Sequence, residues 1–100
     1  MNTTVAEPRI YDRLGVLGDE VRSRVLLLLE QGELTVSEIQ SVLQIPQPTV
    51  SRHLKVLADD GWVKSRSAGT ARPYRLAELD DSQEALWSVV REQVRDSGPV

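Results

Sequence analysis

The chain has no cysteine, a single histidine and few aromatic residues among its 100 residues. Without cysteine it can form no disulfide, thiolate metal site, iron–sulfur cluster or cysteine nucleophile. The longest purely apolar run covers residues 25–29, far short of the ~20 residues that span a bilayer. The acidic amino terminus, with Glu7 and Asp12, lacks the apolar core of a signal peptide. These absences predict a cytoplasmic protein that does not associate with a membrane.

The composition is that of one folded domain. Hydrophobic residues make up 40% of the chain and charged residues 27%, which is typical of globular proteins. We expect a flexible tail over residues 1–7, one domain over 8–96 and a second tail over 97–100. A domain this small buries only a marginal core, so association with another chain is plausible from size alone.

The net charge of −3 hides an asymmetry along the chain. Residues 49–75 hold six basic and two acidic residues, a net charge of +4, whereas the rest holds six basic and thirteen acidic residues, a net charge of −7. A basic segment on an acidic body favours an anionic partner at one face. The alternative is chance clustering of charge in a solvated hairpin.

The sequence predicts two helices with clear boundaries between residues 10 and 32. Ile10, Leu14 and Leu17 repeat with the spacing of one helix face, and Gly18 is typical of a helix end. Asp19 is a candidate N-cap for a second helix, which ends before residues 31–32.

The sequence from Thr35 to Glu38 has the form of a capping box at the start of a third, short helix. Residues 44–46 break that helix, and a fourth begins near Gln47 and ends before Gly61. Because the helix should end at Gln44, we expect either that this residue has a positive φ or that the turn takes a different form. The short connection between the third and fourth helices is that of a helix-turn-helix.

Two short extended runs, 62–66 and 72–76, flank a Gly-bearing loop and predict a β-hairpin, which forms a wing directly after the fourth helix. Pro73 cannot donate to a strand ladder, so its strand should be an edge or irregular there. A last helix begins at Asp80 or Asp81. The predicted fold is therefore mainly α with a small β-hairpin, a winged helix-turn-helix.

The fourth helix has the two faces that a DNA-recognition helix needs. Val50, Leu54 and Leu57 point inward, while polar residues lie at the helix start and on the opposite face. Gln pairs bidentately with adenine and Arg with guanine, so such a helix can read the major groove. The alternative for each polar residue is ordinary solvated surface. The candidate DNA-binding residues of this helix are Gln47, Thr49, Ser51, Arg52, His53 and Lys55.

In the wing, Arg66 and Arg72 bracket the loop, and Thr70 lies at its tip. Arginine at a hairpin tip can bind phosphates or enter the minor groove. The alternative is again a solvated hairpin. A lone histidine such as His53 is structural or a phosphate contact, because no second metal ligand stands near it in sequence.

Four segments, residues 17–26, 32–39, 47–57 and 60–63, resemble the ArsR/SmtB family of winged helix-turn-helix repressors. The run TVSRHLKVL of residues 49–57 is the most specific of these matches. The resemblance covers roughly residues 10–95 and implies a homodimer, built from the first and last helices, that presents two recognition helices to a palindromic DNA operator. The expected interface residues are the apolar residues of these two helices, namely Ile10, Leu14, Leu17, Leu86, Trp87, Val90 and Val94.

The chain also departs from the family pattern. Many members sense metals through a Cys-x-Cys pair, but those positions correspond here to Thr35 and Ser37, which are poor ligands for soft metals. Others use Asp and His on the last helix, which here has no histidine. Gln44 stands where the family usually has a glycine, and Pro46 and Pro48 stand where serines are common. We therefore expect no metal site and no cofactor, and the sequence does not identify an inducer.

Three interpretations follow. The first is a dimeric transcriptional regulator that acts as a repressor and has no enzymatic activity. The second is the DNA-binding end of a longer S-adenosylmethionine-dependent methyltransferase, because some relatives continue into such a domain; residues 1–100 hold no Gly-rich nucleotide loop and no catalytic cluster. The third is a winged helix used only for protein contacts, which the basic hairpin disfavours.

Overall fold

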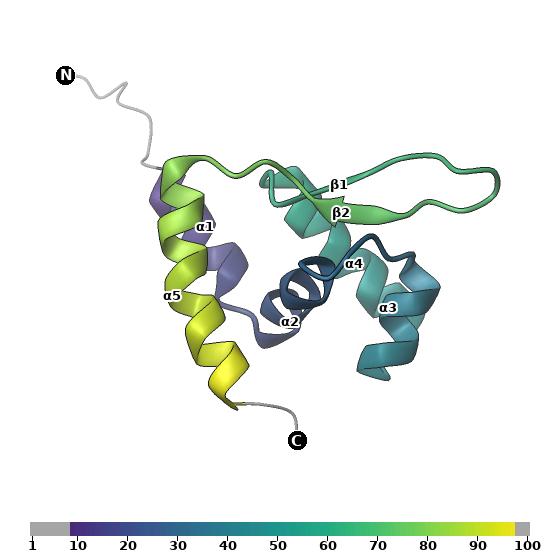
Figure 1. Cartoon of the computed structure of the whole chain (residues 1–100), viewed down its shortest axis with the longest axis horizontal. Coiled ribbons are helices and arrows are strands. Elements are labelled where there is room, and N and C mark those ends of the chain that lie inside the picture. The colour runs from purple at the N-terminus through teal and green to yellow at the C-terminus, as the bar shows by residue number, and fades with distance from the viewer. Residues whose placement is uncertain (1–8, 98–100) are drawn as a thin grey trace.

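The structure, a computed structural model, describes residues 9–97 and contains in that range five helices and one antiparallel hairpin (Figure 1). The elements are α1 (Arg9–Leu17), α2 (Glu20–Leu29), α3 (Val36–Leu43), α4 (Gln47–Asp59), β1 (Val63–Ser65), β2 (Tyr74–Leu76) and α5 (Asp81–Ser97). This order confirms the predicted winged helix-turn-helix. The two predicted tails lie outside the described residues, except that Ser97 is the last residue of α5.

Both predicted helix caps are present. The side chain of Asp19 accepts a hydrogen bond from the backbone N–H of Arg22 at 3.1 Å and so begins α2. The hydroxyl of Thr35 accepts from the backbone N–H of Glu38 at 3.3 Å, and the Glu38 carboxylate accepts from the backbone N–H of Thr35 at 2.8 Å. This reciprocal pair satisfies two amides that the first turn of α3 leaves free.

The turn between α3 and α4 depends on one strained residue. Gln44 has φ 60° and ψ 43°, the left-handed conformation, as the sequence predicted. Its backbone N–H donates to the carbonyl of Gln40 at 2.7 Å, and its side-chain amide donates to the carbonyl of Ser41 at 2.7 Å. A residue with a Cβ is uncommon in this conformation, so these bonds hold a turn that glycine would form with less strain.

The helices divide into two groups that α2 connects. Figure 1 shows α1 and α5 side by side at one end of the molecule, and α3 with α4 at the other. Helix α2 contacts α1, α4 and α5 and so lies between the two groups. The hairpin extends along one side, past the end that carries α3 and α4 (Figure 1). Helix α4 and the hairpin are thus attached, through α2, to a separate pair of helices.

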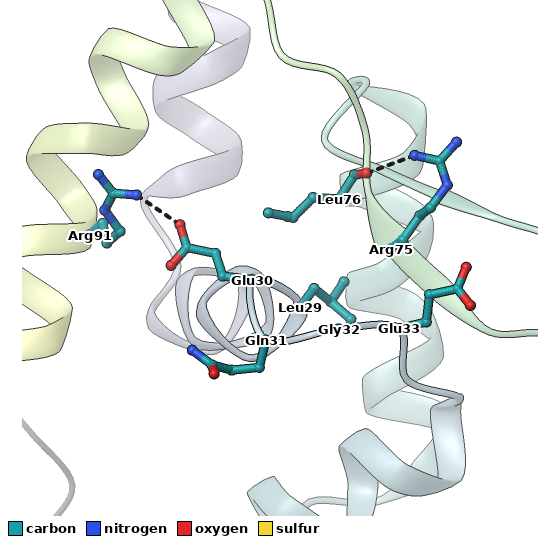
Figure 2. Close-up of a pocket in the computed structure, with 8 residues that line it drawn as sticks. All are labelled: Leu29, Glu30, Gln31, Gly32, Glu33, Arg75, Leu76 and Arg91. Carbon is teal, nitrogen blue, oxygen red and sulfur yellow. Dashed lines mark hydrogen bonds and ion pairs between the residues drawn. The ribbon is translucent and has the colours of Figure 1, made fainter.

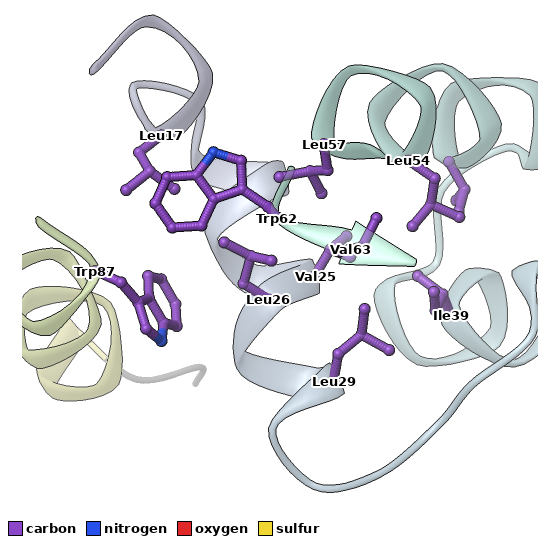
Figure 3. Close-up of a cluster of buried hydrophobic side chains, with 11 residues drawn as sticks. Leu17, Val25, Leu26, Leu29, Ile39, Leu54, Leu57, Trp62, Val63 and Trp87 are labelled. Atoms are coloured by element: carbon purple, nitrogen blue, oxygen red, sulfur yellow. The ribbon is translucent and has the colours of Figure 1, made fainter. Parts of the chain in front are cut away.

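A single core joins these groups (Figure 3). Val25 and Leu26 of α2 meet Leu54 and Leu57 of α4, and all four are at most 1% exposed. The indole of Trp62, directly before β1, is fully buried beside them. Because such packing stabilises a domain through the apolar area it buries, truncating Leu54 to alanine should cost about 2–5 kcal/mol.

The hairpin is shorter than predicted. Three residues pair on each strand, with Val63 opposite Leu76 and Ser65 opposite Tyr74. Pro73 lies just outside the ladder, as expected for a residue without an N–H, and its carbonyl accepts from the backbone N–H of Arg66 at 3.2 Å. On the other edge of β2, Tyr74 exchanges two backbone hydrogen bonds with Leu34, at 2.8 and 3.0 Å. These bonds attach the base of the wing to the segment that precedes α3.

Candidate nucleic-acid interface

Helix α4 has the predicted apolar back and polar front. Val50, Leu54 and Leu57 are fully buried. The backbone N–H groups of Thr49 and Val50 both donate to the carbonyl of Pro46, which begins the helix without a side-chain cap. The exposed polar residues of the helix include Gln47, Ser51, Arg52 and Lys55, and Thr49 is half-buried. The structure therefore gathers the predicted DNA-contacting residues of α4 on one accessible surface, apart from His53.

The charged side chains on this surface make only weak contacts within the chain. One guanidinium nitrogen of Arg52 lies 3.4 Å from the hydroxyl of Thr49. Lys55 forms an ion pair with Asp59 at 3.2 Å, and both side chains are more than 60% exposed. Exposed pairs of this kind contribute about 0–1 kcal/mol, so either cation can exchange its partner for another anion.

His53 lies on the flank of α4 rather than on its front. It is half-buried, and Nη1 of Arg22 on α2 lies 3.3 Å from its Nδ1. Sequence analysis left a structural role and a phosphate contact open for this residue. The structure gives Nδ1 of His53 a contact with Arg22 inside the protein.

In the wing, Arg66 is paired within the chain. Its guanidinium forms a two-pronged ion pair with Glu33, with donor–acceptor distances of 3.0 Å from Nε and 2.8 Å from Nη2. The hydrogen bonds from Arg66 hold the pKa of the Glu33 carboxyl below its usual value, and Glu33 raises the pKa of Arg66. Arg66 was predicted to be a phosphate contact, but in this structure it binds the segment before α3.

The rest of the wing remains accessible. Arg72 is exposed and donates to the hydroxyl of Ser65 at 3.2 Å, and Thr70 is exposed beside Gly69, whose φ of 64° forms the tip. The side chain of Lys64 is exposed as well. The wing therefore presents Arg72 to a partner even when Arg66 is held by Glu33.

A second surface, on α1 and α5, is apolar. Ile10, Leu14 and Val89 are 38%, 48% and 63% exposed, although all three are large hydrophobic residues. Leu86, Val90 and Val94 of α5 are half-buried. Exposed apolar side chains gathered on two adjacent helices are typical of a protein interface.

Two of the predicted interface residues need correction. Leu17 and Trp87 are 5% and 3% exposed and belong to the core of a single protomer. The indole N–H of Trp87 also donates to the carboxylate of Glu30 at 2.9 Å. Both residues have too little free surface to contact a partner. Helical periodicity placed them on the correct helices but could not distinguish the side that faces α2.

A concavity lies between the end of α2, the base of the wing and α5 (Figure 2). Its charged groups already have partners, because Glu30 accepts from Arg91 at 2.9 Å and Arg75 donates to the carbonyl of Leu76 at 3.1 Å. Glu33, at its edge, is bound to Arg66. The carboxylates of this lining are thus paired, whereas the exposed Arg75 keeps its positive charge.

Within residues 9–97 no three side chains of His, Cys, Asp or Glu gather as a metal site would require. Over the same range, none of the helices combines the length and the apolarity needed to cross a bilayer.

Sequence reasoning missed three residues whose side chains join separate elements, namely Arg13, Arg22 and Glu33. Arg13 had a readable signal, because it is a charge within the apolar stripe formed by Ile10, Leu14 and Leu17. Arg22 and Glu33 had none, since their partners lie 31 and 33 residues away along the chain.

Comparison with known proteins agrees with this geometry. The profile of the bacterial regulatory proteins of the arsR family matches residues 19–65, from the start of α2 to β1. An uncharacterized HTH-type transcriptional regulator from Methanocaldococcus jannaschii is 40% identical over 76 residues, which are 75% of this chain and 83% of that protein.

Solved structures show the same fold. The transcriptional repressor BigR from Xylella fastidiosa is 31% identical with a TM-score of 0.71, covering 85% of this chain and 86% of that one. A homodimeric winged helix-turn-helix DNA-binding domain from Mycobacterium bovis, from a possible ArsR-family transcriptional regulator, is 25% identical with a TM-score of 0.67, covering 95% and 92% of the two chains.

Proposed function

Because the chain belongs to the arsR family of bacterial regulatory proteins, we propose that it represses transcription by binding operator DNA as a homodimer. Family membership makes the protein a DNA-binding transcriptional regulator rather than an enzyme. The observation that carries the proposal is α4, whose buried apolar back leaves a polar front exposed next to a basic wing. A regulator of this kind acts at the chromosome, so we place it in the cytoplasm.

In the proposed complex α4 enters the major groove. Gln47, Thr49, Ser51 and Arg52 face base edges, because they lie in the first turns of the helix, where groove contacts concentrate. Lys55 meets a phosphate. Its ion pair with Asp59 is exposed and exchanges readily for the much more highly charged DNA backbone.

The wing contacts the DNA beside the groove. Arg72 and Thr70 are exposed and meet the backbone directly. Arg66 takes part only when it leaves Glu33, because one guanidinium cannot bind both the carboxylate and a phosphate in the same two-pronged geometry.

The homodimer forms through α1 and α5. The proposed contacts are the accessible apolar residues Ile10, Leu14, Leu86, Val89, Val90 and Val94. A stable interface of this type buries at least ~1,000 Å² in total. The homodimeric domain from Mycobacterium bovis supports this arrangement as a structural relative.

Sedimentation tests the interface. Leu14→Asp places a charge in the proposed contact and should yield monomers at micromolar concentration, where the parent chain is dimeric. Val42→Asp is the matched control, because Val42 is 57% exposed on α3, away from the proposed contact. A parent chain that sediments as a monomer, or a Leu14→Asp variant that remains dimeric, contradicts the proposal.

We also propose that regulation does not depend on a metal. Thr35 already uses its hydroxyl to cap α3, and its oxygen is a poor ligand for soft metals. Removing metals with a chelator should leave DNA affinity unchanged. Stoichiometric zinc that survives dialysis and alters DNA affinity would contradict this part of the proposal.

Selection of bound fragments from genomic DNA tests the function as a whole. The protein should enrich fragments that share an inverted repeat, with half-sites about one helical turn, or ~34 Å, apart. Footprinting should then show protection centred on that repeat. Fragments that share no sequence would leave only non-specific binding and overturn the proposed repressor function.

A further inference from the structure

Arg22 connects three helices through its side chain. Its Nε donates to the carbonyl of Val16 at 2.7 Å and its Nη2 to the carbonyl of Gly15 at 3.3 Å, both in the last turn of α1. Its Nη1 lies 3.3 Å from Nδ1 of His53 on α4. The guanidinium therefore satisfies free carbonyls at the end of one helix and fixes a ring on the recognition helix at the same time.

This contact determines which nitrogen of the ring carries the proton. A guanidinium has only donors, so Nδ1 of His53 must accept the hydrogen bond. In the tautomer that this hydrogen bond requires, the ring proton is on Nε2, so the second nitrogen of His53 is a donor whose orientation Arg22 sets.

The second nitrogen is accessible. Among the buried side-chain polar atoms of residues 9–97, only Nε of Arg13 lacks a hydrogen-bond partner. Nε2 of half-buried His53 has no hydrogen bond within that range, so it is not a fully buried atom. On α4, His53 lies between the buried residue Leu54 and the exposed front that carries Arg52. The flanks of a helix in the major groove approach the phosphates that line the groove.

We propose that Arg22 is a positioning residue that directs the Nε2–H of His53 to a DNA phosphate, as a neutral donor held by α1 and α2. The inference rests on the proposed DNA binding by α4 and adds the atom that makes the contact and the residue that orients it. A neutral donor strengthens binding but releases no counterion, which separates its effect from that of a cation.

Two substitutions of His53 test the donor. Asn places its amide near the position of Nδ1, keeps an acceptor for Arg22 and lacks the distal donor; Gln places a donor near the position of Nε2. On a mixed-sequence duplex of about 30 base pairs at about pH 8, His53→Asn should weaken binding about tenfold. His53→Gln should remain within about threefold of the parent chain.

The salt dependence identifies the kind of contact. His53→Asn should leave the slope of log affinity against log salt unchanged, whereas Lys55→Gln should flatten it by about 2 for a dimer. Parent-like affinity of His53→Asn, an equal loss in His53→Gln, or a flatter slope in His53→Asn overturns the proposal. Melting followed by circular dichroism tests whether each variant is folded. If His53→Asn does not fold, the affinity of His53→Gln still decides the test.

A double-mutant cycle tests Arg22. Arg22→Lys keeps the charge but cannot serve both carbonyls and the ring, so it should weaken binding in the parent chain and add almost nothing in the His53→Asn background. Additive losses would mean that Arg22 acts without His53 and would overturn its positioning role. If the parent chain itself binds no duplex, the proposed function fails; if only the His53 and Arg22 results fail, DNA binding stands and this inference does not.

Discussion

Breaking the buried ion pair between Arg13 and Asp60 is predicted to destabilise the fold strongly. Arg13, on α1, is 6% exposed and donates to Asp60 at 3.2 Å and to Asp80 at 3.0 Å. The other carboxylate oxygen of Asp60 accepts from the indole N–H of Trp62 at 2.9 Å. This cluster joins α1, the end of α4 and the start of α5.

Replacing Arg13 by methionine leaves Asp60 buried without its main counter-charge. Removing one partner of a buried pair costs about 3–5 kcal/mol, which is a large share of the ~5–15 kcal/mol that stabilises a typical domain. Arg9 moderates the loss only slightly, because it is 68% exposed and 3.8 Å from Asp60. The variant should therefore be mostly unfolded at temperatures at which the parent chain is stable.

Urea denaturation measures this cost as a change in the free energy of unfolding. The double variant Arg13→Met with Asp60→Asn should lose less than Arg13→Met alone, because no uncompensated charge remains. Lys55→Met is the control, since Lys55 forms an i,i+4 pair with Asp59 in which both side chains are more than 60% exposed, and should cost about 1 kcal/mol or less. If Arg13→Met costs no more than Lys55→Met, the argument from burial is refuted.

Three further predictions concern the turn, the wing and the start of α5. Gln44→Gly should raise the melting temperature, with a gain of up to about 1 kcal/mol from the relieved left-handed strain, whereas Gln40→Gly within α3 should lower it; a clear loss of stability in Gln44→Gly would contradict this. Glu33→Gln should free Arg66 and steepen the salt dependence of DNA binding by about 2 for a dimer, and an unchanged slope would show that Arg66 does not reach phosphate. The backbone N–H of Gln83, the Ser82 hydroxyl and Arg13 hold the pKa of Asp80 below its usual value. The stability that ionised Asp80 contributes to the fold is therefore present at neutral pH and is lost as the pH falls through that lowered pKa. The difference in melting temperature between the parent chain and Asp80→Asn should accordingly shrink below about pH 4, and a constant difference would disprove the linkage.

The features predicted correctly from the sequence are local ones. The caps at Asp19 and Thr35 and the left-handed Gln44 each depend on residues within one helical turn. Apolar spacing likewise located the helices, because a buried face must repeat every three or four residues. The hairpin followed from two short extended runs and a glycine, although its ladder proved shorter than the runs.

The features that the sequence did not reveal are long-range. Glu33 and Arg66 meet because the wing folds back on the segment before α3, and periodicity contains no information about such a contact. Trp87 was assigned to a partner surface because its helix is amphipathic, but only the packed structure shows that its indole faces α2. The spacing of residues within one helix shows which face is apolar. Which element packs against that face depends on the whole fold.

The most direct test of the central claim, that α4 reads DNA sequence, is the effect of Arg52→Ala on specific and non-specific binding. Once the selected operator is known, its affinity and that of a mixed-sequence duplex are measured at the same salt concentration. The variant should lose about 1–3 kcal/mol of binding free energy on the operator and much less on the mixed-sequence duplex, because the base contact of Arg52 forms only where that base is present. An equal loss on both would make Arg52 a phosphate contact and would contradict the assignment of sequence reading to this residue.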